Sequence, residues 1–169
     1  MKDTKKIVMM GLFVSMALAL HIFEKAIPVP FITPGAKLGL SNIITLTVLM
    51  YLGFKDAFTV LVARIILGSI FGGGLSGFIY SISGGLLSIL VMALIKRLGK
   101  ENVSVIGISV AGAVFHNIGQ LLAAAFIINN INIFTYLPIL FIAAVGTGVF
   151  VGLVAKYLLA SLDKIVNIY

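Results

Sequence analysis

Long apolar runs, separated by short polar or charged clusters, dominate this chain. The runs do not alternate between apolar and polar residues as the short strands of a membrane β-barrel would, and their length is typical of helices that cross a bilayer. The pattern therefore predicts an all-α integral membrane protein. We expect a six-helix bundle that forms one transmembrane domain over residues 1–169, with spans at approximately 7–23, 38–52, 57–70, 77–95, 103–128 and 136–160.

Two predicted spans, 38–52 and 57–70, are shorter than the roughly 20 residues that a bilayer requires. Either they extend into their flanking residues, or neighbouring helices shield them from lipid. The first run, 7–23, is followed by Glu24 and Lys25 instead of a small-residue cleavage site. We therefore expect a membrane span there and not a cleaved signal peptide.

The composition agrees with a lipid-exposed surface. Apolar residues make up 61% of the chain and charged residues only 10%, and the mean hydropathy is +1.23. A soluble domain is about a quarter charged. No cysteine is present, which excludes disulfides and thiolate metal sites.

The basic residues gather at alternate ends of the predicted spans. If the N-terminus is cytoplasmic, nine of them fall on the cytoplasmic side and only Lys25 and Lys37 on the other, with Arg64 inside a span. This asymmetry is the positive-inside bias, and it predicts a multi-pass protein with both termini cytoplasmic. The bias also accounts for the net charge of +7, so we expect a lipid membrane as partner and no nucleic acid.

The connections predicted on the outer side are the more elaborate ones. The first, residues 24–37, contains all but one of the prolines, Pro34 among them, and proline stiffens a loop by fixing φ. The second, residues 71–77, is rich in glycine and is predicted to be a flexible loop. A binding site open to the outside would lie among these connections.

Polar side chains at or inside apolar runs are candidates for such a site, because a charge at mid-bilayer costs roughly 2.5–3.5 kcal/mol. Lys37 stands just before the second run and Asn42 lies about one turn further in. Arg64 has only apolar neighbours in the chain. It either pairs with Glu24 or with backbone carbonyls of a broken helix, or it binds an anionic group in a cavity.

A second polar group lies in the run 103–128. His116 and Gln120 are four residues apart and share a helix face, with Asn117 one position round. These side chains must face the bundle interior or a cavity, either as structural hydrogen-bond partners or as ligand contacts. The predicted small-molecule site consists of both groups: Lys37, Asn42, Arg64, His116, Asn117 and Gln120.

Catalytic chemistry is not predicted. The aspartates form no pair, and the aspartate-rich magnesium motifs of a prenyl diphosphate synthase are missing. The glycines at 72–74 lack the Lys-Ser/Thr of a Walker loop, and only His21 could join His116 at a metal. We therefore expect no enzyme activity in this chain, no metal and no cofactor.

Small residues recur four apart in three runs, a spacing that lets membrane helices approach closely. Internal packing is the simplest interpretation for each. For the first run, which is terminal and has one free side, an external partner helix is an alternative. The residues concerned are Gly11, Ser15 and Ala19, then Gly77, Ser81 and Gly85, then Gly148 and Gly152.

Three blocks of the chain together resemble the Gx transporter family: Pro34–Ile43, Ser83–Ser88 with the following Met92, and Gly107–Gln120. That family is often labelled heptaprenyl diphosphate synthase component I. It is grouped with the substrate-binding S components of energy-coupling factor (ECF) transporters. The resemblance covers essentially the whole chain.

The resemblance implies a six-helix S component in a bacterial plasma membrane, which captures a small micronutrient or precursor from outside. Its partners would be a transmembrane coupling subunit, contacted through Gly11, Ser15 and Ala19, and two cytoplasmic ATPases that supply the energy. The first outer loop, with Glu24, Pro34 and Gly35, would form a lid over the pocket.

Three functions are consistent with the sequence. We expect substrate capture for uptake, and the cations Lys37 and Arg64 indicate an anionic substrate. The alternatives are a membrane accessory subunit of a prenyl diphosphate synthase, as the family label suggests, and a purely structural membrane protein.

Overall fold

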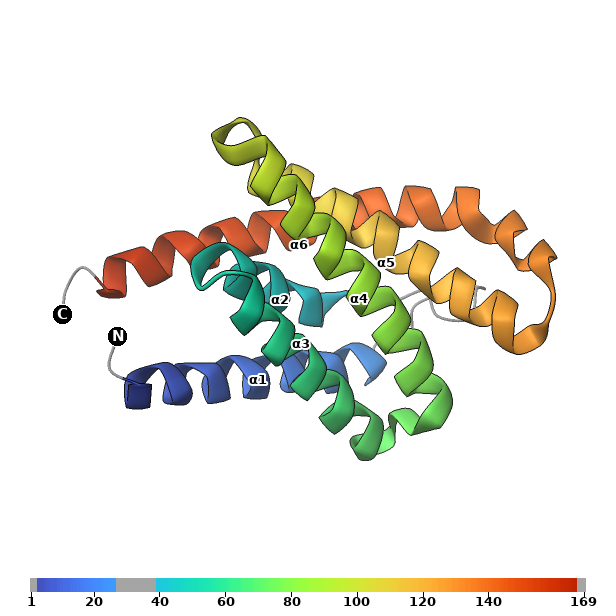
Figure 1. Cartoon of the computed structure of the whole chain (residues 1–169), viewed down its shortest axis with the longest axis horizontal. Coiled ribbons are helices and arrows are strands. Elements are labelled where there is room, and N and C mark those ends of the chain that lie inside the picture. Colours follow the sequence, from blue (N-terminus) through green and yellow to red (C-terminus); the bar gives the residue numbers. More distant parts are fainter. Residues whose placement is uncertain (1–2, 27–38, 167–169) are drawn as a thin grey trace.

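The computed structural model describes residues 3–26 and 39–166, and every regular element in these ranges is helical. The predicted all-α fold is therefore confirmed. The α-helices are α1 (Asp3–Ala26), α2 (Leu40–Tyr51), α3 (Phe54–Gly68), α4 (Gly74–Gly99), α5 (Val105–Ile128) and α6 (Leu137–Val166) (Figure 1). Three short helical turns join α3 to α4, α4 to α5 and α5 to α6: η1 (Ser69–Gly73), η2 (Lys100–Asn102) and η3 (Ile131–Tyr136).

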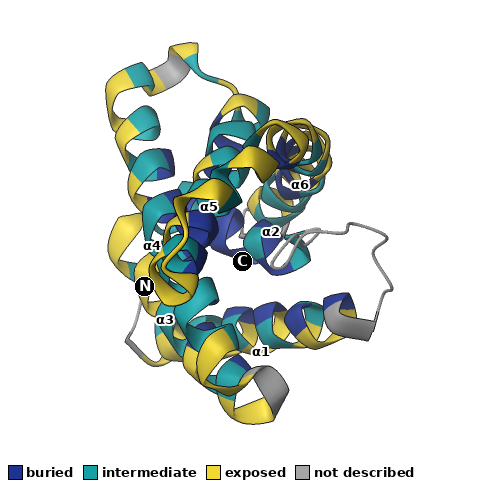
Figure 2. Ribbon diagram, turned by 90° about the vertical axis from the view of Figure 1, so that its right-hand side faces the viewer, coloured by how far each residue is buried: buried dark blue, intermediate teal, exposed yellow. Residues whose placement is uncertain are grey.

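Four stretches of helix are long and apolar enough to cross a membrane: Thr4–Glu24, Gly74–Gly99, Val105–Ile128 and Ile131–Lys164. Large apolar side chains lie on their outward faces, where Phe126 is 88% exposed, Ile142 73% and Ile7 70%. Figure 2 shows buried residues turned towards the centre of the bundle and exposed residues turned away from it. Lipid, and not water, solvates such a surface, so the chain is a multi-pass membrane protein.

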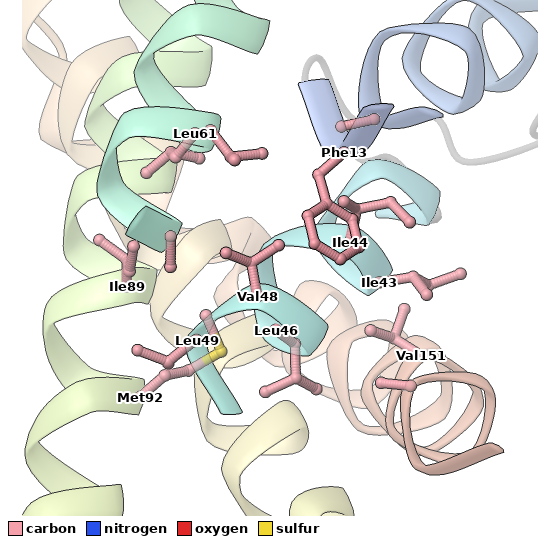
Figure 3. Packing of buried hydrophobic residues seen from close by; sticks show 14 of the residues in the cluster. Phe13, Ile43, Ile44, Leu46, Val48, Leu49, Leu61, Ile89, Met92 and Val151 are labelled. Atoms are coloured by element: carbon pink, nitrogen blue, oxygen red, sulfur yellow. The ribbon is translucent and has the colours of Figure 1, made fainter. Parts of the chain in front are cut away.

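Helix α2 is short and lies in the middle of the bundle. Its 12 residues extend about 18 Å, and it packs against α1, α3, α4 and α6. All residues from Ser41 to Leu49 are buried except Asn42. In Figure 3 its apolar side chains meet residues of the surrounding helices: Phe13, Leu61, Ile89, Met92 and Val151. Of the two alternatives for this short run, shielding by neighbouring helices is therefore the one observed.

The prediction of a flexible loop at residues 71–77 is wrong. Helix α3 continues into the π-helical turn η1 at Ser69–Gly73, and α4 begins directly afterwards at Gly74. Backbone that stays helical keeps its polar groups hydrogen-bonded, which matters most in an apolar environment. Gly74 has φ of 60° and ψ of −176°, a conformation that essentially only glycine adopts, and the chain changes direction there.

Glycines allow α4, α5 and α6 to pack with their backbones in contact. A Cβ atom on Gly119 would lie 2.6 Å from the carbonyl oxygen of Ser83 on α4. On the opposite side of α5, a Cβ on Gly148 of α6 would lie 2.6 Å from the Cα of Val110. Such close approach is how membrane helices gain packing energy without a hydrophobic driving force.

The small-residue spacing has different roles in different helices. In α4 and α6 internal packing accounts for part of it, since a Cβ on Gly85 would meet Leu61 and one on Gly152 would meet Ile106, whereas nothing lies within 4 Å of a Cβ on Gly77. In α1 the corresponding residues Gly11, Ser15 and Ala19 are all exposed. The first run therefore presents its small residues outward, and internal packing does not account for them.

The first residues of α1 and the last residues of α6 lie at the same end of the bundle (Figure 1). Near this end Lys6 of α1 forms a salt bridge of 2.8 Å with Asp56 of α3. At the end of α4, the Nζ of Lys96 donates to the carbonyl oxygens of Leu49 (2.8 Å) and Met50 (3.2 Å) on α2. Basic residues thus gather at the end where α1 begins and α6 ends; the side of the membrane on which it lies stays a prediction.

Replacing Gly119 by alanine is expected to lower the midpoint of thermal unfolding in detergent. The added methyl group would overlap the Ser83 carbonyl oxygen, and overpacking of this kind costs about 1–3 kcal/mol. Gly146→Ala is the matched control, because nothing lies within 4 Å of a Cβ there and alanine favours a helix by roughly 0.5–1 kcal/mol. Equal midpoints for the two variants would contradict the proposed backbone contact.

Candidate functional site

Buried polar side chains are concentrated where α1 ends and α2 begins. Glu24 is 4% exposed, Arg64 3% and Gln120 5%, and His21 and Ser41 are buried beside them. They come from four different helices, each at or near the same end of the bundle. Burial of so many polar groups requires that they satisfy one another or a ligand.

Arg64 is the centre of this cluster. Its Nη1 donates a hydrogen bond to Oγ of Ser41, and its Nη2 lies 3.4 Å from Oδ1 of Asn42. Glu24 is close enough to interact electrostatically with the guanidinium. The predicted partner Glu24 and the predicted site residue Asn42 are thus both brought to Arg64, and the guanidinium does not need carbonyls of a broken helix.

Glu24 also connects α1 to α2. Its carboxylate accepts a hydrogen bond from the backbone N–H of Gly39, the residue that precedes α2 and has φ of 73°. The first N–H groups of a helix have no partner within it, and a negative charge is favourable there. Glu24 therefore supplies a hydrogen-bond acceptor and a negative charge at the start of α2. The predicted lid residues Pro34 and Gly35, and the predicted contact Lys37, lie outside the described residues.

Two pockets adjoin at this point. The polar pocket has a volume of about 270 Å³, including the space at its mouth, and only Gly39 among its lining residues lacks a polar side chain. Its lining is His21, Glu24, Gly39, Ser41, Asn42, Arg64, Ser81, His116 and Gln120.

The central pocket has a volume of about 390 Å³, again including its mouth, and mixes apolar with polar walls. It shares Gly39, Asn42 and His116 with the polar pocket. The rest of its lining is Leu46, Ser88, Met92, Ser109, Gly112, Ala113, Asn117, Thr147 and Val151.

Two nitrogen atoms in the polar pocket's walls have no hydrogen-bond partner among the described residues. They are Nε of Arg64 and Nε2 of Gln120, both fully buried. An unsatisfied buried donor costs about 1–3 kcal/mol. A ligand that accepts hydrogen bonds would remove that cost.

The polar group predicted in the run 103–128 is divided between the pockets. His116 and Gln120 line the polar pocket, as their shared face predicts. Asn117 lines the central pocket, and its Nδ2 donates to the carbonyl oxygen of Leu140 on α6 at 3.1 Å. One donor of Asn117 thus holds α5 to α6.

A glycine on α4 makes room for the polar face of α5. A Cβ on Gly84 would lie 2.8 Å from the backbone oxygen of His116 and 2.9 Å from Cγ of Gln120. In the central pocket, a Cβ on Gly112 would lie 2.6 Å from Sδ of Met92. The pocket walls therefore depend on glycine as much as on the polar residues.

The structure adds residues to the site that sequence reasoning did not propose. They are four serines, one threonine and one histidine: Ser41, Ser81, Ser88, Ser109, Thr147 and His21. Isolated hydroxyl groups in apolar helices usually bond to their own backbone, so they carry little signal. His21 is three residues before Glu24 and shares its helix face. Among the added residues, only this spacing could have indicated a site residue from the sequence. No group of three potential metal ligands occurs among the described residues.

The chain resembles one known protein family. No curated protein and no solved structure shows significant similarity to the chain. A family model described as heptaprenyl diphosphate synthase component I matches residues 13–158. The match covers most of the chain and includes every described residue of both pockets, and it confirms the resemblance found in the sequence. The chain belongs to the heptaprenyl diphosphate synthase component I family, also called the Gx transporter family.

Proposed function

We propose that this protein is the substrate-binding membrane component of an ECF-type uptake transporter, which captures a small micronutrient or precursor from outside the cell. The observation that carries the proposal is the pair of adjoining pockets inside an otherwise apolar bundle. Their walls hold buried donors on Arg64 and Gln120 that have no partner among the residues the structure describes. A bundle with a purely structural role gains nothing from such groups, because each destabilises the fold.

The pocket walls suggest how a substrate would be held. Gln120 and Asn42 would hydrogen-bond its polar part in the polar pocket, while Leu46, Met92 and Val151 offer an apolar wall in the central pocket. A few convergent polar groups beside apolar walls are the usual design of a small-molecule site. The substrate is therefore small, with a polar and an apolar part.

The proposed substrate is anionic. Arg64 is the only arginine or lysine among the described residues that line either pocket. Its two terminal nitrogens already serve Ser41 and Asn42, and Glu24 balances part of its charge. An anionic group would thus engage Nε of Arg64, which has no partner within the described part of the chain. Lys37, outside the described residues, would supply the second cation.

Helix α1 supports the proposed assembly with a coupling subunit. Gly11, Ser15 and Ala19 form an exposed stripe, and nothing lies within 4 Å of a Cβ on Gly11. A partner helix could approach this stripe closely. The two ATPases would hydrolyse ATP in place of this chain, which has no Walker loop. In this arrangement both termini face the cytoplasm of a bacterial cell and the pockets open outward.

The family description favours a second candidate function, that of a membrane accessory subunit of a heptaprenyl diphosphate synthase. In that role the exposed stripe of α1 would contact a synthase subunit instead of a coupling subunit. The chain would contribute no catalytic aspartates, since its sequence lacks the aspartate-rich motifs.

Gln120→Leu is expected to weaken binding of the natural small molecule about five- to tenfold, because the lost hydrogen bond is worth roughly 1–1.5 kcal/mol. Native mass spectrometry of gently purified protein would detect the retained molecule and compare the variants. Thr45→Val is the matched control: its Oγ1 is also buried with no partner in the described ranges, but it lines neither pocket. A wild-type protein that retains no small molecule, with both variants more stable, would favour the structural role.

The Glu24–Arg64 pair predicts a characteristic double-variant result. Glu24→Gln or Arg64→Met alone leaves one buried charge uncompensated and is expected to cost about 3–5 kcal/mol of stability. The double variant removes both charges and should recover most of that loss, as measured by thermal unfolding. If the stable double variant binds the substrate with unchanged affinity, Arg64 has a structural role only.

Gly11→Leu is expected to leave the unfolding midpoint of the isolated chain unchanged, because the position is open, and to abolish co-purification of the partner complex. Leu12→Phe is a control for added bulk at an exposed position outside the stripe. Recovery of a coupling subunit with two ATPases by the wild-type chain supports transport. Recovery of a soluble, aspartate-rich synthase instead supports the accessory role.

A further inference from the structure

A groove with no role in the site described above lies at the far end of α2 from the two pockets. It runs between the last turn of α2, the first turn of α3 and the C-terminal half of α4, and has a volume of about 930 Å³ including its open side. We call it the α2–α4 groove. Its lining is apolar except for Lys96 and Arg97.

The apolar lining follows one face of α4. Leu90, Ala93, Leu94 and Arg97 are three or four residues apart and therefore stack along the helix. The distance from Leu90 to Arg97 along the axis is about 10 Å. Leu90 is 53% exposed, Leu94 55% and, across the groove, Phe54 41%.

Lys96 is held in place at the end of this groove. Two of the three protons on its Nζ are used by the carbonyl oxygens of Leu49 and Met50 in the last turn of α2. The third remains for another acceptor, and Arg97 beside it is exposed. Neither side chain forms a salt bridge within the residues that the structure describes.

The position of the groove in the membrane determines which part of a lipid each of its two ends contacts. Helix α4 is one of the helices that are long enough to span, so the leucines lie at the depth of acyl chains. The basic residues of its last turn lie at the level of the headgroups, as is usual for Lys and Arg at span ends. Pockets between membrane helices with a basic rim are typical binding sites for anionic lipid headgroups.

We propose that the α2–α4 groove binds one anionic phospholipid, with its phosphate on Lys96 and Arg97 and an acyl chain between Phe54 and the leucines of α4. The negative phosphate complements the two basic side chains. The apolar wall is suited to an acyl chain, which a soluble anion does not have. The phosphate would accept the third proton of Lys96 and so connect the lipid to the end of α2. This proposal rests on contacts at the far end of the bundle and is independent of the transport function.

The first test is native mass spectrometry of protein released from vesicles that contain equal amounts of phosphatidylglycerol and phosphatidylcholine. The wild-type chain is expected to retain phosphatidylglycerol in preference. Arg97→Gln should weaken that preference roughly fivefold, the contribution of one basic residue at a membrane surface. Ala93→Phe, which fills the groove, should reduce retention of the same lipid. Lys96 is not varied, because its loss would also leave the end of α2 uncapped.

Two controls separate a site from general attraction to the surface. Lys156→Gln removes an exposed charge of α6 outside the groove, and Leu98→Phe adds bulk to an exposed position of α4 outside it. Both are expected to retain phosphatidylglycerol as the wild type does. If Arg97→Gln and Ala93→Phe behave like the wild type, or if Lys156→Gln loses the lipid equally, the proposal is overturned.

A photo-reactive amino acid at Leu90 tests the identity of the occupant in native membranes. An adduct with the mass of an anionic phospholipid supports the proposal, and Arg97→Gln should decrease its yield. An adduct of polypeptide size would overturn it, because a protein subunit would then cover the groove.

Discussion

Helix α2 is too short to reach water at both of its ends, and this constraint accounts for the placement of a charged side chain at each end. A helix of 12 residues cannot reach water on both sides of a bilayer, yet its first N–H groups and last carbonyl groups need partners. Glu24 serves the first end through Gly39, and Lys96 serves the second through Leu49 and Met50. Charged side chains are therefore tolerated in an apolar bundle where the backbone needs them.

The proposed pocket is a consequence of the same constraint. Glu24 at the start of α2 calls for a balancing cation, and Arg64 on α3 supplies it while donating to Ser41 and Asn42. The polar faces of α4 and α5 meet this cluster because Gly84 leaves room for His116 and Gln120. Glu24, which caps the start of α2, is thus also a pocket wall, so stability and ligand binding are coupled at this end of the bundle.

The polar positions can be identified from the sequence, whereas the partners of those side chains cannot. Arg64, His116 and Gln120 stood out because each interrupts a long apolar run, and a polar group there must face inward. The structure brings these residues and Asn42 to one pocket. It turns Asn117 towards Leu140 of α6, a contact that depends on the rotation of two helices about their axes. Local patterning carries no information about that rotation.

The sequence by itself determined that the chain is helical, that its outer surface faces lipid and that a few polar residues lie inside, because hydropathy and periodicity act over one or two turns. Only the tertiary structure decided that α2 is shielded at the centre, that Ser41 and Ser81 line a pocket, and that residues 69–73 are a π-helical turn and not part of a loop. These outcomes depend on which helix neighbours which and how closely they approach. The glycines at 84, 119 and 148 determine that distance, and their effect exists only when two backbones meet.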